Sequence, residues 1–152
     1  MSNNDKIASA LNDLLTRNYD AERGYTEAGN NATDGPLRKW MFENANRRKR
    51  FGKEIKKMIA ALGHEPDKGT SFLGDVHRAW IDLKSSMTSN EEEAILEECI
   101  RGEERALEDY NKVLKDVDMP ASVTETIQRQ RNDIKTALKD VKILEESFEN
   151  IS

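Results

Sequence analysis

The sequence predicts an all-α protein, a four-helix bundle formed by residues 1–152 as a single domain. Four long segments repeat apolar residues at steps of three and four positions, which is the spacing of one helix face. Eight glycines and three prolines leave few turn positions, so a many-stranded β fold is disfavoured. Hydrophobic residues make up 36% of the chain, which is enough for a packed core and too much for a disordered protein.

The first two long helices are expected over residues 3–28 and 36–62. The segment Gly29-Asn30-Asn31 is expected to end the first helix. Pro36 fits the first turn of the second helix, because that turn leaves its N–H groups unbonded in any case. Gly63 is expected to stop the second helix, since glycine adopts the left-handed conformation that often follows a helix.

A shorter helix is expected over residues 72–87, and two long helices follow over residues 90–117 and 120–149. Ser89 begins a capping box, in which its hydroxyl accepts a hydrogen bond from an amide of the first turn. Pro120 separates the last two helices, because proline does not continue the helix before it.

The connection over residues 63–89 decides between two topologies. It is far too long for a hairpin, and a helix with flanking loops of this length could travel the full length of the bundle. We therefore expect a long crossover connection that carries the short extra helix, with the second and third long helices parallel. The alternative is a simple up-and-down order in which the short helix lies across one end.

Charge is distributed unevenly along the chain. Residues 37–58 contain nine Lys or Arg and two Glu, a net charge of +7, whereas residues 91–118 contain eleven acids and four bases, a net charge of −7. We expect these two helices to be neighbours that attract each other. The alternative is that Arg47-Arg48-Lys49-Arg50 binds nucleic acid. The chain's net charge of −5 and the lack of interleaved aromatic residues disfavour specific nucleic-acid binding.

No segment approaches the run of about 20 apolar residues that a membrane helix requires, and the first residues do not resemble a secretory leader. The single cysteine, Cys99, excludes an internal disulfide and is typical of a reducing compartment. These observations predict a cytoplasmic protein without a membrane partner.

Polar residues interrupt the apolar face of every long helix. Burying a polar or charged group without a partner destabilises the folded protein by roughly several kcal/mol. These side chains are therefore expected to contact one another, a metal ion or water. The predicted buried network consists of Asn18, Glu22, Tyr25, Arg48, Glu103, Tyr110 and Gln130.

Several segments resemble the uncharacterised bacterial family DUF2383, a family of four-helix-bundle proteins, over about residues 5–145. The segments that carry this resemblance are Leu11-Asn12-Asp13-Leu14, His77-Arg78-Ala79-Trp80 and Glu97-Glu98-Cys99-Ile100-Arg101-Gly102-Glu103. The resemblance implies a bundle of the ferritin-like superfamily, and it implies no established activity or substrate.

The di-metal pattern of ferritin-like bundles, a Glu on each of two helices and Glu-x-x-His on the other two, transfers poorly. Glu22 and Glu103 match the single carboxylates, but Arg48 stands near the place of a metal ligand on the second helix. On the fourth helix the nearest match is Gln130 followed by Asp133. Glu22, Glu103 and Asp133 are therefore only weak metal candidates. The favoured hypothesis is that Arg48 replaces the metal and bridges Glu22 and Glu103.

The sequence therefore predicts an uncharacterised, non-enzymatic ferritin-like bundle with no catalytic residues and no cofactor. We expect it to act through self-association or a protein partner, in a role related to stress. The alternative is a metal-binding or oxygen-handling ferritin relative that uses iron or manganese. A nucleic-acid binder is the least favoured of the three classes.

Overall fold

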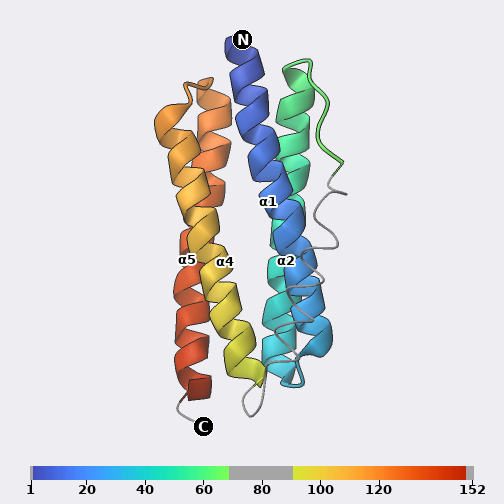
Figure 1. Ribbon diagram of the computed structural model, residues 1–152, viewed down its shortest axis with the longest axis vertical. Coiled ribbons are helices and arrows are strands. Elements are labelled where there is room, and N and C mark those ends of the chain that lie inside the picture. Colours follow the sequence, from blue (N-terminus) through green and yellow to red (C-terminus); the bar gives the residue numbers. More distant parts are fainter. Residues whose placement is uncertain (1, 69–90, 150–152) are drawn as a thin grey trace.

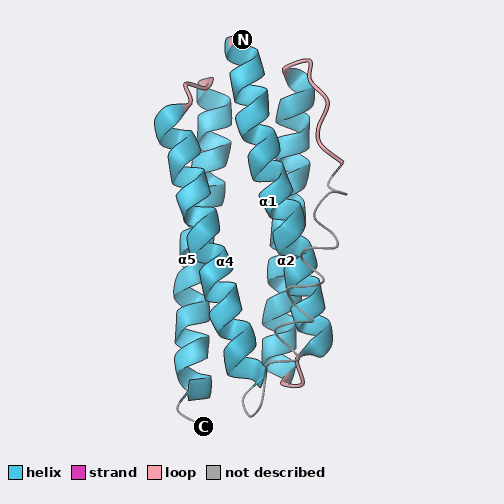
Figure 2. Ribbon diagram, viewed as in Figure 1, coloured by secondary structure: helices cyan, strands magenta, loops and turns pink. Residues whose placement is uncertain are grey.

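The structure is a computed structural model that describes residues 2–68 and 91–149, and these residues form a bundle of four long helices (Figures 1 and 2). The helices are α1 (Asn3–Asn31), α2 (Gly35–Ala61), α4 (Glu91–Asp116) and α5 (Ala121–Glu149). The described ranges contain no strand, so the all-α fold class is confirmed. The short helix predicted over 72–87 and the capping box at Ser89 lie outside the described residues.

The starts of α1 and α2 follow from their caps. The Ser2 hydroxyl accepts a hydrogen bond from the Asp5 amide at 3.1 Å, and the Asp5 carboxylate accepts one from the Ser2 amide at 3.2 Å. The Asp34 carboxylate accepts from the Leu37 amide at 3.0 Å, with proline in the same first turn. Gly63, at φ +80°, ends α2 as expected.

Helix α1 ends within the predicted stop segment, at Asn31, but it runs past the expected bound of residue 28 and includes Gly29. Gly29 is buried inside the helix. A Cβ atom placed on Gly29 would lie 2.7 Å from Cε1 of Phe42, so the missing side chain makes room for that ring. The glycine therefore serves the close packing of α1 against α2 and does not serve as a helix stop.

The topology is the predicted crossover. In Figure 1, α1 descends from the N-terminal end, α2 and α4 both ascend, and α5 descends. The second and third long helices are therefore parallel, and the simple up-and-down alternative is wrong. Helix α1 packs against α2 and α4, and α5 packs against α4 and α2, so α2 and α4 lie on a diagonal of the bundle.

This diagonal contradicts the expected pairing of the two oppositely charged helices. The described parts of α2 and α4 do not pack side by side. Long side chains join them across the core, as in the buried ion pair of Arg48 with Glu103 and the contact of Met41 with Cys99. The exposed cations of α2 consequently face away from the acidic helix. None of the helices in the described ranges has the length and apolar character that crossing a membrane would take.

The core consists of two apolar clusters with a polar layer between them. One cluster, which includes Ile7, Leu11 and Ile55, lies toward the N-terminal end of α1. The other, which includes Leu37 and Met41, lies toward the opposite end. In the described part of the chain, the buried polar and charged residues are Asn18, Asn44, Arg48, Glu103 and Gln130. The candidate site is therefore built at mid-bundle, where all four helices contribute.

Candidate functional site

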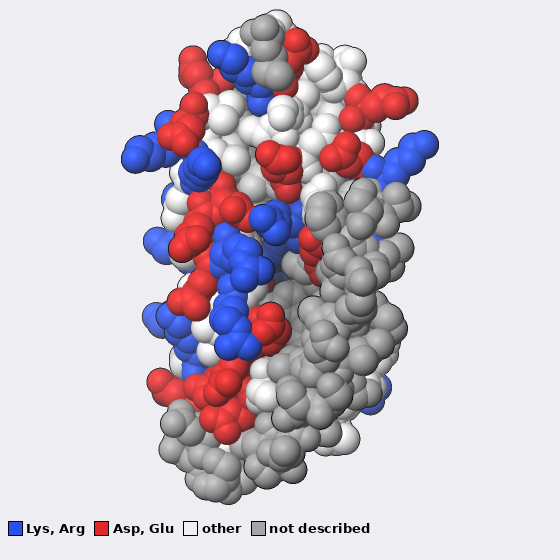
Figure 3. All heavy atoms as spheres, viewed as in Figure 1, with Lys and Arg blue, Asp and Glu red and all other residues white. Residues whose placement is uncertain are grey.

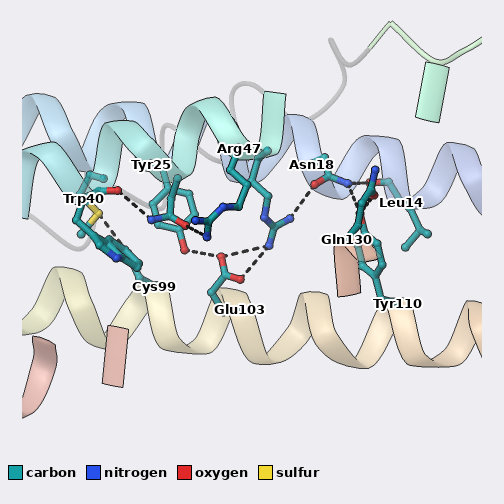
Figure 4. Close-up of polar contacts among 12 residues, drawn as sticks. Leu14, Asn18, Tyr25, Trp40, Arg47, Cys99, Glu103, Tyr110 and Gln130 are labelled. Carbon is teal, nitrogen blue, oxygen red and sulfur yellow. Dashed lines mark hydrogen bonds and ion pairs between the residues drawn. The ribbon is translucent and has the colours of Figure 1, made fainter. Parts of the chain in front are cut away.

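The centre of the polar layer is an ion pair that water does not reach. Arg48 from α2 is 3% exposed, and Glu103 from α4 is 2% exposed. Nη2 of Arg48 lies 3.2 Å from both carboxylate oxygens of Glu103 (Figure 4). The Tyr25 hydroxyl from α1 donates a further hydrogen bond to Oε1 of Glu103. The negative charge of Glu103 is thus balanced by a guanidinium and solvated by protein donors.

A second group of amides and a hydroxyl extends from the ion pair. Nη1 of Arg48 donates to Oδ1 of Asn18 at 2.9 Å. Nδ2 of Asn18 donates at 2.8 Å to the Tyr110 hydroxyl and at 2.8 Å to the Leu14 carbonyl. The Tyr110 hydroxyl in turn donates to Oε1 of Gln130 at 2.6 Å. Each of these polar atoms has a partner of the correct type, so hydrogen bonds within the protein offset the cost of removing these groups from water.

The chain of hydrogen bonds reaches the surface beyond Gln130. Nε2 of Gln130 donates to the Phe51 carbonyl at 3.3 Å and to Oε1 of Glu54 at 3.1 Å. The other oxygen of Glu54 pairs with Arg129, which is half exposed. Sequence reasoning missed Glu54 and Arg129. The sequence did contain one indication of them. A buried glutamine at position 130 needs an acceptor for its side-chain NH2 group, and the facing helix is where that acceptor would lie.

The structure brings together six of the seven residues predicted for the buried network, and Glu22 is the exception. Glu22 is half-buried, and within the described residues its carboxylate makes no hydrogen bond or ion pair. Successive helix residues differ by about 100° in direction, and Ala21 rather than Glu22 packs against the core. The hypothesis that Arg48 bridges Glu22 and Glu103 is therefore wrong, because Arg48 serves Glu103 and Asn18.

The third metal candidate, Asp133, is also only half-buried, because Ile134 takes the inward position on α5. Sequence reasoning missed one buried polar residue of α2, Asn44. Its Nδ2 donates to the Trp40 carbonyl at 2.9 Å, and its Oδ1 accepts from Nη1 of Arg47 at 3.1 Å. Asn44 extends the polar layer along α2 and is not bonded to the Arg48–Glu103 pair.

Burial sets the protonation of the tyrosine hydroxyls and the cysteine thiol. Burial raises the pKa of Tyr110 to about 12. Burial, followed by the charge of Glu103, holds the pKa of Tyr25 well above its usual value. Burial and the nearby carboxylates also raise the pKa of the Cys99 thiol, whose Sγ lies 3.8 Å from Sδ of Met41. All three groups keep their protons at neutral pH, so both tyrosines are available as donors.

The guanidinium of Arg48 remains charged. Burial has the largest single effect and lowers its pKa, but the Glu103 carboxylate together with Tyr110 and Tyr25 outweighs burial, so the pKa lies above its ordinary value. A fixed cation therefore stands at mid-bundle.

The residues of this layer do not fit the pair of metal ions that a ferritin-like bundle implies. Arg48 offers only donors and a positive charge, and Glu103 already accepts from Arg48 and Tyr25. Glu22 and Asp133 lie outside the layer. Among the described residues, the acidic side chains that do converge are Glu93, Glu97 and Glu145, away from Arg48 and toward the opposite end of α4 from Asp116.

The comparison with family models shows the family. A family described as "Domain of unknown function (DUF2383)" matches residues 6–116, which include most of α1 and all of α2 and α4. The match ends before α5, so it is shorter than the expected span of about 5–145. A search of curated proteins found no match. Because the match covers most of the chain and includes five of the six connected core residues, the chain belongs to the DUF2383 family.

Proposed function

We propose that this protein is a non-catalytic bundle of ferritin-like type, in which a hydrogen-bonded network with balanced charges occupies the place of a di-metal centre. The observation that carries the proposal is the pairing of Glu103 with Arg48 and Tyr25 deep in the core. A carboxylate in that position is the group that would hold a metal ion in a functional centre.

The chemistry of the layer supports this interpretation. A buried carboxylate needs a counter-charge, and the guanidinium of Arg48 supplies it together with hydrogen bonds from Nη2 to both oxygens of Glu103. The remaining members, Asn18, Tyr110 and Gln130, satisfy one another and offer no carboxylate. Such a layer stabilises one specific alignment of four helices and leaves no activated nucleophile, base or open coordination position. We infer that the protein acts through its outer surface, by self-association or by binding a protein partner.

The test is elemental analysis after aerobic loading with Fe(II) or Mn(II) and gel filtration. We expect no ion whose retention depends on Glu103, so Glu103→Gln and the matched surface control Glu104→Gln should retain the same amount as the wild type. Glu104 is the exposed neighbour of Glu103. Two ions per chain that are lost only in Glu103→Gln would contradict the proposal.

The same measurement addresses the alternative of a metal-binding ferritin relative. Glu93, Glu97 and Glu145 each offer an oxygen, and these oxygens all lie within 4.8 Å of one another. Exposed acidic groups of this kind are common in proteins without a bound ion. One retained ion per chain that disappears in Glu97→Gln and persists in Glu103→Gln would support that alternative and leave the account of the central layer intact.

A further inference from the structure

The outer side of α2 carries a stripe of cations, which we call the basic stripe and define as Lys49, Arg50, Lys53 and Lys57. All four side chains are exposed, and they make no ion pair or hydrogen bond with the described part of the chain. Their spacing places them along one side of the helix over about 12 Å, at 1.5 Å per residue. The side chain of Arg48, on the opposite side of α2, points into the core.

A groove of complementary charge lies elsewhere on the bundle, between α1 and α4. It has a volume of about 700 Å³ and is lined by Asp13, Asp67 and Asp116, which we call the acidic groove. These three aspartates are exposed, and their carboxylates have no ion-pair partner among the described residues. The floor is apolar and includes Leu14 and Val113.

Two cations also line the acidic groove. Arg17 is paired with Asp109 at 2.9 Å, so these two charges cancel. Lys112 is exposed and reduces the negative charge of the groove. The groove therefore keeps an excess of negative charge. In Figure 3, which views the molecule from the side of α1 and α4, acidic and basic side chains are correspondingly mingled over this face.

We propose that the basic stripe of one copy docks along the acidic groove of a second copy, an inference that rests on the proposed surface role. The α4 wall of the groove, from Asp109 to Asp116, is about 10.5 Å long, which is close to the length of the stripe. Docking would pair charges that are unpaired in the single chain. The apolar stems of the lysines would cover the apolar floor.

The positions of the two features determine the type of assembly. Because α2 and α4 are diagonal, the outer side of α2 and the α1–α4 groove face different directions. Two copies related by a two-fold axis could not engage both features at once, so the contact is head-to-tail and can add further copies. Nucleic acid would neutralise the stripe but would leave the groove aspartates unpaired, which is why the structure favours a second copy.

The experiment is sedimentation equilibrium of the full chain at low and high salt. We expect a mass above 17.3 kDa that rises with concentration at low salt and returns to the monomer value near 1 M salt, where the Debye length is about 3 Å. Lys53→Glu/Lys57→Glu and Asp13→Lys/Asp116→Lys should each weaken association by about tenfold or more. An equimolar mixture of these two variants should recover it, because each then offers the charge that the other requires.

The matched control is Lys135→Glu/Lys139→Glu, which makes the same change of charge on exposed lysines of α5. It should associate like the wild type. A wild type that stays monomeric at every salt concentration would overturn the inference, as would equal weakening by the control or a mixture that fails to associate. Binding of mixed-sequence duplex DNA by the stripe of a monomeric protein would assign the stripe to nucleic acid instead. None of these outcomes affects the metal test of the proposed function.

Discussion

Arg48 and Ile55 lie two turns apart on the inner face of α2, and both are almost completely buried, yet they stabilise the bundle by different means. Ile55 belongs to an apolar cluster, in which the stabilising effect is proportional to buried area and depends little on direction. Arg48 depends on Glu103 and Asn18, because a buried guanidinium without both partners is strongly unfavourable. The apolar ends therefore supply stability, and the polar middle specifies which residues must face each other.

The difference concerns alignment as well as energy. An apolar cluster tolerates a small shift of one helix along its neighbour, because Leu, Ile and Met can repack. The middle layer does not, because a shift of one turn would move Glu103 by about 5.4 Å and break its bonds to Arg48 and Tyr25. The layer thus fixes the register between the α1–α2 hairpin and the α4–α5 hairpin.

The largest expected effect comes from removing the cation of the middle layer. Arg48→Leu should lower the free energy of unfolding by about 3–5 kcal/mol, because Glu103 would remain buried without a counter-charge. Urea unfolding followed by circular dichroism measures this change. A loss below about 1 kcal/mol would show that the middle layer is no more demanding than the apolar ends.

Alkaline pH should weaken the middle layer selectively. The pKa of Tyr110 is raised to about 12 in the folded protein from its ordinary value of 10.0. A raised folded pKa means that the contribution of Tyr110 is complete below pH 10 and is lost as the pH rises through 12. The loss should reach about 2–3 kcal/mol, at 1.36 kcal/mol per pKa unit.

The measurement for this prediction is stability against pH between 9 and 12 for the wild type and Tyr110→Phe. The variant lacks the titrating hydroxyl, so its stability should fall less over this range. Parallel curves would assign the alkaline loss to other groups.

The next largest difference between the apolar clusters and the middle layer is expected for conservative substitutions. Ile55→Leu keeps volume and polarity, so it should cost less than about 1.5 kcal/mol. Arg48→Lys keeps the charge but loses the planar fork that reaches both Glu103 and Asn18, so it should cost about 2–3 kcal/mol. Thermal unfolding of the two variants side by side gives the comparison. Equal losses of stability in the two variants would mean that side-chain geometry matters no more in the middle layer than in the apolar clusters.

The smallest effect is expected where the hydrogen-bond chain reaches water. Arg129 is half exposed, and its pair with Glu54 is screened by solvent and salt. Arg129→Gln should therefore change the unfolding free energy by less than about 1 kcal/mol, and the change should vanish at high salt. Urea titrations at two salt concentrations would detect a larger, salt-independent loss if Glu54 were needed to hold Gln130.

The periodicity of apolar residues predicts which positions of a helix face the core, and it predicts no contact between particular helices. Helix periodicity identified the inward positions, so Asn18, Arg48 and Gln130 could be placed in the core without coordinates. It could not resolve Ala21 from Glu22, since adjacent positions at the edge of a face differ by only about 100°. For that reason Arg48 was expected to bridge Glu22 and Glu103, and only the Glu103 half of that bridge is present.

The other errors concern relations between helices, which periodicity does not contain. The net charges of α2 and α4 suggested neighbours, but the crossover places these helices on a diagonal. Gly29 resembled a helix stop, and its actual role depends on Phe42 of the facing helix. Glu54 completes the network only because α5 brings Gln130 beside it. Each of these outcomes depends on which helix faces which.

The most direct test of the central claim is a double-mutant cycle on Arg48 and Glu103, measured by urea unfolding at neutral pH. Arg48→Leu and Glu103→Leu should each be strongly destabilising, whereas the double variant should lie within about 2 kcal/mol of the wild type. A coupling free energy of about 3 kcal/mol or more between Arg48 and Glu103 would show that each charge is stabilised by the other. Additive losses in the double variant would contradict the account, because the charge of Glu103 would then not depend on that of Arg48.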